Sequence, residues 1–113
     1  MRYHYIDVNE KKIIISQFTK TKKKYDIIID DSTHLFTHQI NIISSTYKFL
    51  KPGGILVIED IYKFRKGYEE NKYYEKLKPV FKFFSYITFI DTPHINNFTA
   101  NWKNEKILLL IKK

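Results

Sequence analysis

The apolar residues of this chain follow patterns that predict alternating strands and helices. Tyr25 to Asp31, which reads YDIIIDD, places three consecutive isoleucines before two acids. Such a continuous apolar run is typical of an inner parallel strand that is buried on both faces. Between Phe36 and Lys51 the apolar residues recur at spacings of four, three, four and three, which predicts an amphipathic helix packed against a sheet. Ile55 to Ile58, which reads ILVI, predicts a second buried strand.

Short polar and glycine-containing segments set the limits of these elements. Ser32 and Thr33 follow the first strand, and both residue types are preferred as helix N-caps. The Pro52–Gly54 segment is expected to stop the helix, with a glycine in the left-handed conformation. The strand, the helix and the second strand have about the length of one βαβ unit, so we expect the two strands to be parallel neighbours.

The C-terminal half predicts one more helix and two more strands. Glu69 to Phe81 reads as a helix that is interrupted near Pro79. Phe84 to Asp91 alternates as a strand, and Lys106 to Ile111 reads as a final strand. We expect these two strands to pair in antiparallel fashion across a polar loop from Thr92 to Asn104.

The N-terminal segment gives a weaker pattern. Tyr3 to Val8 fits a strand, and Glu10 to Phe18 fits either a short helix or another strand. With 113 residues the chain is expected to form a single α/β domain. Its 43% hydrophobic and 17% aromatic residues exclude a disordered protein, and the absence of cysteine excludes disulfides and thiolate zinc sites.

The net charge of +8 allows two interpretations. A basic protein can bind nucleic acid or another anionic surface. The alternative is that abundant Lys, Ile, Asn, Tyr and Phe reflect AT-rich coding sequence, with the local run Lys22–Lys24 in a surface loop. Because neither a signal peptide nor a membrane span is apparent, we expect a cytoplasmic protein (in the host cytoplasm if viral) without a membrane partner.

Acidic residues end both predicted strands of the βαβ unit. Asp30 and Asp31 end the first, Glu59 and Asp60 end the second, and His34 follows the first. Ligands of open parallel sheets bind at these carboxyl ends, and carboxylate oxygens suit Mg²⁺. Histidine beside such an ion suits the role of general base. The alternative is that the acids are solvated strand ends and that His34 is a turn residue.

These motifs resemble a known family. The run from Tyr25 to His34, the K-P-G-G at Lys51 to Gly54 and the E-D pair at Glu59 and Asp60 resemble the second half of class I S-adenosylmethionine-dependent methyltransferases. More narrowly, they resemble the metal-dependent macrocin and mycinamicin type of sugar O-methyltransferase. K-P-G-G is common to many methyltransferases, whereas D-D-x-x-H combined with E-D is more specific.

The resemblance implies a partial Rossmann-like sheet and a chemistry. S-adenosylmethionine would be the methyl donor, Asp31 and Asp60 would bind Mg²⁺, and His34 would take a proton from a sugar hydroxyl. The ion would fix a pair of neighbouring hydroxyls and lower the pKa of the attacked oxygen. The hydroxyl-bearing acceptor would be a small molecule or a glycan.

The chain departs from this family in two ways. Ser32 replaces a glycine, which would cost roughly 1–2 kcal/mol if the position needs a positive φ. The family's first strand, glycine-rich cofactor loop and second strand are missing, since only 24 residues precede Tyr25. The cofactor-binding residues are therefore unknown. The strand Tyr25–Asp31 would also have an open edge, which we expect a dimer mate, a partner chain or Tyr3–Val8 to cover.

Two classes of function remain. The first is a fragment, or a degenerate relative, of a magnesium-dependent O-methyltransferase that acts on a sugar-like hydroxyl. The second is a non-catalytic binding or scaffold module whose basic surface holds nucleic acid or an acidic protein partner. His38 lies four residues after His34 and is expected to be a solvated helix residue. Tyr62 to Lys66 is either a contact for an anionic substrate or a solvated loop.

Overall fold

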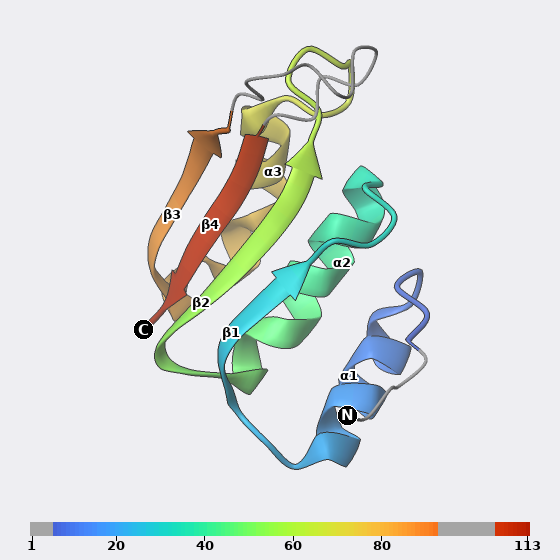
Figure 1. Cartoon of the computed structure of the whole chain (residues 1–113), viewed down its shortest axis with the longest axis vertical. Coiled ribbons are helices and arrows are strands. Elements are labelled where there is room, and N and C mark those ends of the chain that lie inside the picture. Colours follow the sequence, from blue (N-terminus) through green and yellow to red (C-terminus); the bar gives the residue numbers. More distant parts are fainter. Residues whose placement is uncertain (1–5, 93–105) are drawn as a thin grey trace.

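A computed structural model describes residues 6–92 and 106–113 and places four strands in one sheet (Figure 1). The elements in chain order are α1 (Lys11–Thr21), β1 (Tyr25–Asp30), α2 (Phe36–Thr46), the 3-10 helix η1 (Tyr47–Phe49), β2 (Leu50–Ile61), α3 (Glu70–Leu77), the 3-10 helix η2 (Lys78–Phe83), β3 (Phe84–Asp91) and β4 (Lys106–Lys112). The sheet order is β1-β2-β4-β3, with β1 and β2 parallel and the other pairs antiparallel. The α/β class, the parallel βαβ unit and the antiparallel C-terminal pair are confirmed.

The core lies on one face of the sheet, between the strands and the helices. Leu56 and Ile58 of β2 and Leu108 and Leu110 of β4 point to this face and are completely buried. They alternate with less buried neighbours, as the period of two in a strand requires. Burial of each such side chain stabilises the fold by about 1.5–3 kcal/mol. This one-sided core holds the two central strands in place.

The opposite face of the sheet is apolar and exposed among the described residues. Ile27 and Ile29 of β1 are 57% and 59% exposed, and Tyr86 and Ile90 of β3 are exposed as well. The strand register places Ile27, Ile55, Ile111 and Tyr86 in one row across this face. The prediction that β1 is buried on both faces is therefore wrong for the described chain. β1 lies at the edge of the sheet, and the helices pack against the other side (Figure 1).

The K-P-G-G segment lies inside β2 and does not cap the helix. α2 ends at Thr46, earlier than expected, and η1 continues the chain into β2. From Leu50 to Ile55 β2 advances five residues while β1 advances two, so the glycines lie in an irregular stretch of the ladder. A side chain on Gly54 would meet the Lys51 carbonyl oxygen at 2.8 Å and the Tyr25 carbonyl oxygen at 3.1 Å. Glycine is required here because the backbones of β1 and β2 approach closely.

The remaining predictions have mixed outcomes. The segment from Glu10 onward forms a helix rather than a strand, and Pro79 lies in η2, where α3 has ended. Ser32 and Thr33 do not cap α2, whose N-cap is Leu35 without a side-chain bond.

Two predicted segments lie partly outside the described residues. Residues 6–8 do not form a strand, and the rest of the segment predicted over residues 3–8 lies outside the described residues. Most of the loop predicted over residues 92–104 also lies outside them. Within residues 6–92 and 106–113, no helix is both long and apolar enough for a membrane span.

Candidate metal and acid–base site

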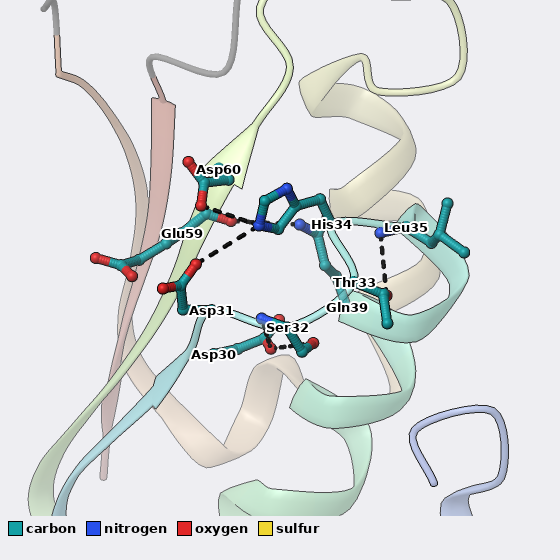
Figure 2. A network of polar contacts seen from close by, with 9 residues as sticks. All are labelled: Asp30, Asp31, Ser32, Thr33, His34, Leu35, Gln39, Glu59 and Asp60. Atoms are coloured by element: carbon teal, nitrogen blue, oxygen red, sulfur yellow. Dashed lines mark hydrogen bonds and ion pairs between the residues drawn. The ribbon is translucent and has the colours of Figure 1, made fainter. Parts of the chain in front are cut away.

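Three predicted site residues meet at the carboxyl ends of the two parallel strands (Figure 2). Asp31 directly follows β1, Asp60 lies near the end of β2, and His34 lies in the turn between β1 and α2. His34 Nε2 is 3.0 Å from Asp60 Oδ2 and 3.5 Å from Asp31 Oδ1. One ligand atom from each residue falls within 4.8 Å of the others. The parallel register, which pairs Asp30 with Ile58, brings these groups together.

The backbone of the site is strained at two of these residues. His34 has a φ of 65° and Asp60 a φ of 57°, both in the left-handed region. For a non-glycine residue this conformation costs roughly 1–2 kcal/mol. Such strain persists only where the surroundings enforce it, and it concentrates at functional sites. Ser32 does not have a positive φ, so the cost considered for its replacement of glycine does not arise there.

Asp30 anchors the turn and is not part of the three-residue cluster. Its side chain is buried and accepts hydrogen bonds from the Ser32 backbone N–H at 3.1 Å and from the Ser32 hydroxyl at 2.5 Å. Burial raises the pKa of the Asp30 carboxyl, and the bonds from Ser32 partly offset this. Ser32 thus replaces the glycine with a residue that fixes the end of β1.

Glu59 adds negative charge beside the cluster, but its carboxylate points away from His34 (Figure 2). Partial burial and the charges of the neighbouring aspartates raise the pKa of the Glu59 carboxyl. Its backbone has a different role. The Glu59 carbonyl oxygen accepts a long bond, 3.5 Å, from Gln39 Nε2 of α2.

A buried polar pair supports this end of β2, and the sequence reading missed it. Gln39 and Tyr73 are both completely buried, and the Tyr73 hydroxyl donates to Gln39 Oε1 at 2.5 Å. Gln39 in turn reaches the residue directly before Asp60. The apolar spacing of α2 gave no signal for Gln39, because a buried glutamine cannot be told from an exposed one without its partner. Burial raises the pKa of the Tyr73 hydroxyl, so it stays a proton donor.

The cluster fits a hard divalent cation. Two carboxylates and an imidazole converge within bonding reach of one point, and the three side chains are 63%, 27% and 26% exposed in the order Asp31, His34, Asp60. Mg²⁺ usually takes one or two protein carboxylates and completes its shell with water or substrate oxygens. Asp31 and Asp60 would hold the ion from two strands, and the exposed side leaves room for those oxygens.

The described residues do not fit a complete S-adenosylmethionine site. Gly53 and Gly54 lie inside β2, and Gly67 lies in the loop before α3. None of these glycines forms a glycine-rich turn between a strand and a helix of the kind that binds a nucleotide cofactor.

In the loop between β2 and α3, Arg65 packs against two tyrosine rings. The Arg65 guanidinium lies 4.7 Å from the ring centre of Tyr62 and 5.7 Å from that of Tyr68, and both tyrosines are buried. Lys63 forms an ion pair with Asp91 at 3.7 Å. Arg65 and Lys63 thus bond within the protein, which favours the loop interpretation of this segment over a contact for an anionic substrate.

Basic residues gather at the opposite end of the sheet. A hollow of about 360 Å³ is lined by the rings of Phe18 and Phe49 and by the lysines of the Lys22–Lys24 run and Lys48. These lysines form no ion pair with any carboxylate of residues 6–92 and 106–113. The acidic site and the basic hollow thus lie at the two ends of β1.

Comparison with known proteins finds similarity both in sequence and in fold. No protein-family model matches the chain. The 8-demethyl-8-alpha-L-rhamnosyl tetracenomycin-C 2'-O-methyltransferase of Streptomyces olivaceus is 42% identical over 36 residues, which are 32% of this chain and 10% of that protein. The structure of the MycE methyltransferase from the mycinamycin biosynthetic pathway, in complex with Mg and SAH, superimposes with a TM-score of 0.60 at 16% identity. This match covers 98% of the chain and 32% of MycE.

These matches confirm the resemblance that the motifs indicate. The chain has a partial methyltransferase fold of the MycE type, and a short stretch of its sequence is similar to that of a rhamnosyl O-methyltransferase. The fold match spans about a third of MycE, and the sequence match spans about a tenth of the Streptomyces protein. The roles of Asp31, His34 and Asp60 are not tested by these comparisons and stay predictions.

Proposed function

We propose that this chain supplies the metal- and acceptor-binding part of a magnesium-dependent, S-adenosylmethionine-dependent O-methyltransferase. The acceptor would carry a hydroxyl, as a sugar does. The single observation that carries the proposal is the convergence of Asp31, His34 and Asp60 at the carboxyl ends of two parallel strands. The methyltransferase fold match and the short sequence match to a sugar O-methyltransferase support it.

In this proposal two residues of the cluster bind the metal ion and the third accepts a proton. Asp31 and Asp60 would hold Mg²⁺, which when bound would fix two neighbouring hydroxyl oxygens and lower the pKa of one of them. His34 would accept the proton from that hydroxyl at Nε2, the nitrogen that faces both carboxylates. Once Nε2 has taken the proton, Asp60 would stabilise the imidazolium, because its Oδ2 lies 3.0 Å from that nitrogen. The contribution of these residues is mainly positional, so small displacements should be costly.

The cofactor-binding half would come from polypeptide outside the 113 residues. We infer that it contains a glycine-rich turn and adds a strand beside β1. The open edge of β1 supports the added strand. The exposed Ile27 and Ile29 support further cover on that face, since parallel sheets are normally covered on both faces. This makes the chain a part of a longer or split enzyme, or a relative that has lost the donor site.

Calorimetric titration tests the proposal. Mg²⁺ added to the chain should bind at one site, whereas S-adenosylmethionine should not bind at micromolar concentration with or without Mg²⁺. Absence of any Mg²⁺ site would overturn the proposed metal dependence. Micromolar binding of S-adenosylmethionine to this chain alone would instead show that the donor site is complete.

The comparisons do not favour the alternative of a non-catalytic, nucleic-acid-binding module, and one titration separates it. A single-stranded RNA oligonucleotide should bind weakly or not at all. If the basic hollow did bind phosphates, the affinity would fall steeply as the salt concentration rises.

A further inference from the structure

His38, expected to be a solvated helix residue, lies in α2 and forms hydrogen bonds at both ring nitrogens. It lies in the first turns of α2 and is half-buried. Its Nδ1 is 2.7 Å from the Thr33 hydroxyl, and its Nε2 is 2.5 Å from Asn9 Oδ1. It is not a member of the acidic cluster, which among the described residues consists of Asp31, His34 and Asp60.

The direction of each bond in this network can be assigned. The Leu35 backbone N–H donates to the Thr33 hydroxyl oxygen at 3.4 Å, which leaves the hydroxyl proton for His38 Nδ1. Asn9 Oδ1 is a carbonyl oxygen and can only accept, so His38 Nε2 carries the proton. Neutral His38 should therefore hold its proton at Nε2, with Nδ1 free to accept.

The far end of the network is fixed as well. The Asn41 side-chain amide of α2 donates to the carbonyl oxygens of Val8 and Asn9, both at 3.1 Å. This holds the segment before α1 against α2, so that Asn9 offers His38 a fixed acceptor. The bond from His38 Nε2 to Asn9 therefore fixes the imidazole of His38 on the side away from Thr33.

The near end of the network encloses His34. Thr33 and Leu35 are its two neighbours in the chain, and the Thr33 hydroxyl bonds both to the Leu35 backbone and to His38. His34 itself has a left-handed φ of 65°, a conformation that its surroundings must enforce. We propose that His38 is a positioning residue: through Thr33 it holds the backbone of His34 in the left-handed conformation and keeps its imidazole facing Asp60.

Paired variants test this inference, which rests on the proposed function only where cation binding is measured. His38→Leu keeps the bulk and removes both bonds, Thr33→Val removes the hydroxyl, and Thr33→Ser restores it. Thr37→Val is the matched control, because Thr37 is an exposed threonine of α2 that forms no side-chain bond within the described residues. NMR couplings and chemical shifts report the φ of His34 in the cation-free protein.

In His38→Leu and Thr33→Val the His34 signals should change from one left-handed conformer to an average. The affinity for Mn²⁺ should stay nearly unchanged in these two variants, because Asp31 and Asp60, and not His34, are the proposed ligands. Thr33→Ser and Thr37→Val should leave both as in the wild-type protein. Nitrogen-15 NMR should show that His38 is protonated at Nε2. An unchanged His34 conformer in His38→Leu, an equal change in Thr37→Val, or an Nδ1-protonated His38 overturns the inference. If the wild-type protein binds no cation, the proposed function fails while the conformer measurement still decides the role of His38.

Discussion

His34 Nε2 lies 3.0 Å from Asp60 Oδ2, and both residues have a left-handed backbone. A turn and a strand end, far apart in the chain, thus each adopt an unfavourable conformation at the point where their side chains meet. The contact lets the roles of base and ligand be separated by substitution.

Asp60→Asn should weaken Mg²⁺ binding about tenfold or more, which is about 1.4 kcal/mol, because it removes a charged oxygen ligand. His34→Gln should leave Mg²⁺ affinity nearly unchanged if His34 is the base. Calorimetry measures both, with Asp26→Asn as a control at the other end of β1, where Asp26 is exposed and pairs with Lys51. If His34→Gln loses the cation as Asp60→Asn does, His34 is a ligand and its assignment as base is wrong.

Tyr73→Phe should lower the free energy of unfolding by about 1–3 kcal/mol, because it leaves the buried Gln39 oxygen without its donor. Urea denaturation measures the change. Tyr47→Phe is a suitable control, because the Tyr47 ring stacks on Phe83 and keeps that contact without its hydroxyl. Equal losses of unfolding free energy in the two variants would show that the Gln39–Tyr73 hydrogen bond does not stabilise the protein more than an ordinary tyrosine hydroxyl does.

Gly54→Ala should destabilise the protein by about 1–3 kcal/mol, because the new methyl group would meet the Lys51 carbonyl oxygen of β2 at 2.8 Å and the Tyr25 carbonyl oxygen of β1 at 3.1 Å. The second contact would force β2 away from β1. Gly53→Asn should cost much less. Gly53 has a φ of 81° and no atom near the position of a side chain, and asparagine tolerates this conformation better than most residues. Thermal denaturation of the two variants distinguishes close approach from backbone conformation, and a larger loss at Gly53 would contradict the packing argument.

Glu69→Gln should lower the melting temperature at pH 7 and have no effect in strong acid. Hydrogen bonds from its own backbone N–H and from that of Gly67 hold the pKa of the Glu69 carboxyl below its usual range, and Lys72 adds to this. A depressed pKa in the folded protein stabilises it above the ordinary range of glutamate, and this stabilisation is lost as the pH falls through the depressed value. Glu75→Gln is the control, because Glu75 is an exposed residue within α3, the helix that Glu69 precedes as N-cap. A pH-independent difference at Glu69 would contradict this account.

Ile29→Thr should change the stability of the isolated chain by less than about 1 kcal/mol, because Ile29 is 59% exposed. Leu56→Ala, at a completely buried position of β2, should cost about 2–5 kcal/mol. Denaturation at low protein concentration measures both. A large loss for Ile29→Thr would mean that a second copy already covers this face, and light scattering on the same samples would detect it.

The sequence predicted the fold where periodicity and motif agree. The isoleucine run of β1, the spacing of α2 and the ILVI segment of β2 each have one plain interpretation, and the family resemblance placed Asp31, His34 and Asp60 near one another. Burial of β1 was misjudged because an apolar run indicates what a strand can bury, whereas the neighbours present decide what it does bury.

Other features depend on contacts that no local pattern encodes. The left-handed backbone of His34 and Asp60, the Gln39–Tyr73 bond and the position of the K-P-G-G segment inside β2 all arise from the approach of segments distant in the chain. Ser32 is a further example, because its backbone conformation was not predicted correctly from the motif. The motif suggested strain at its position, while the structure places the strain two residues later, at His34.

The acidic site and the basic hollow at the two ends of β1 give the molecule an electric dipole along its strands. A divalent cation that approaches the lysine end is repelled, and one that approaches Asp31 and Asp60 is attracted, although the chain as a whole carries +8. The rate of cation capture should therefore follow this local field rather than the sign of the net charge.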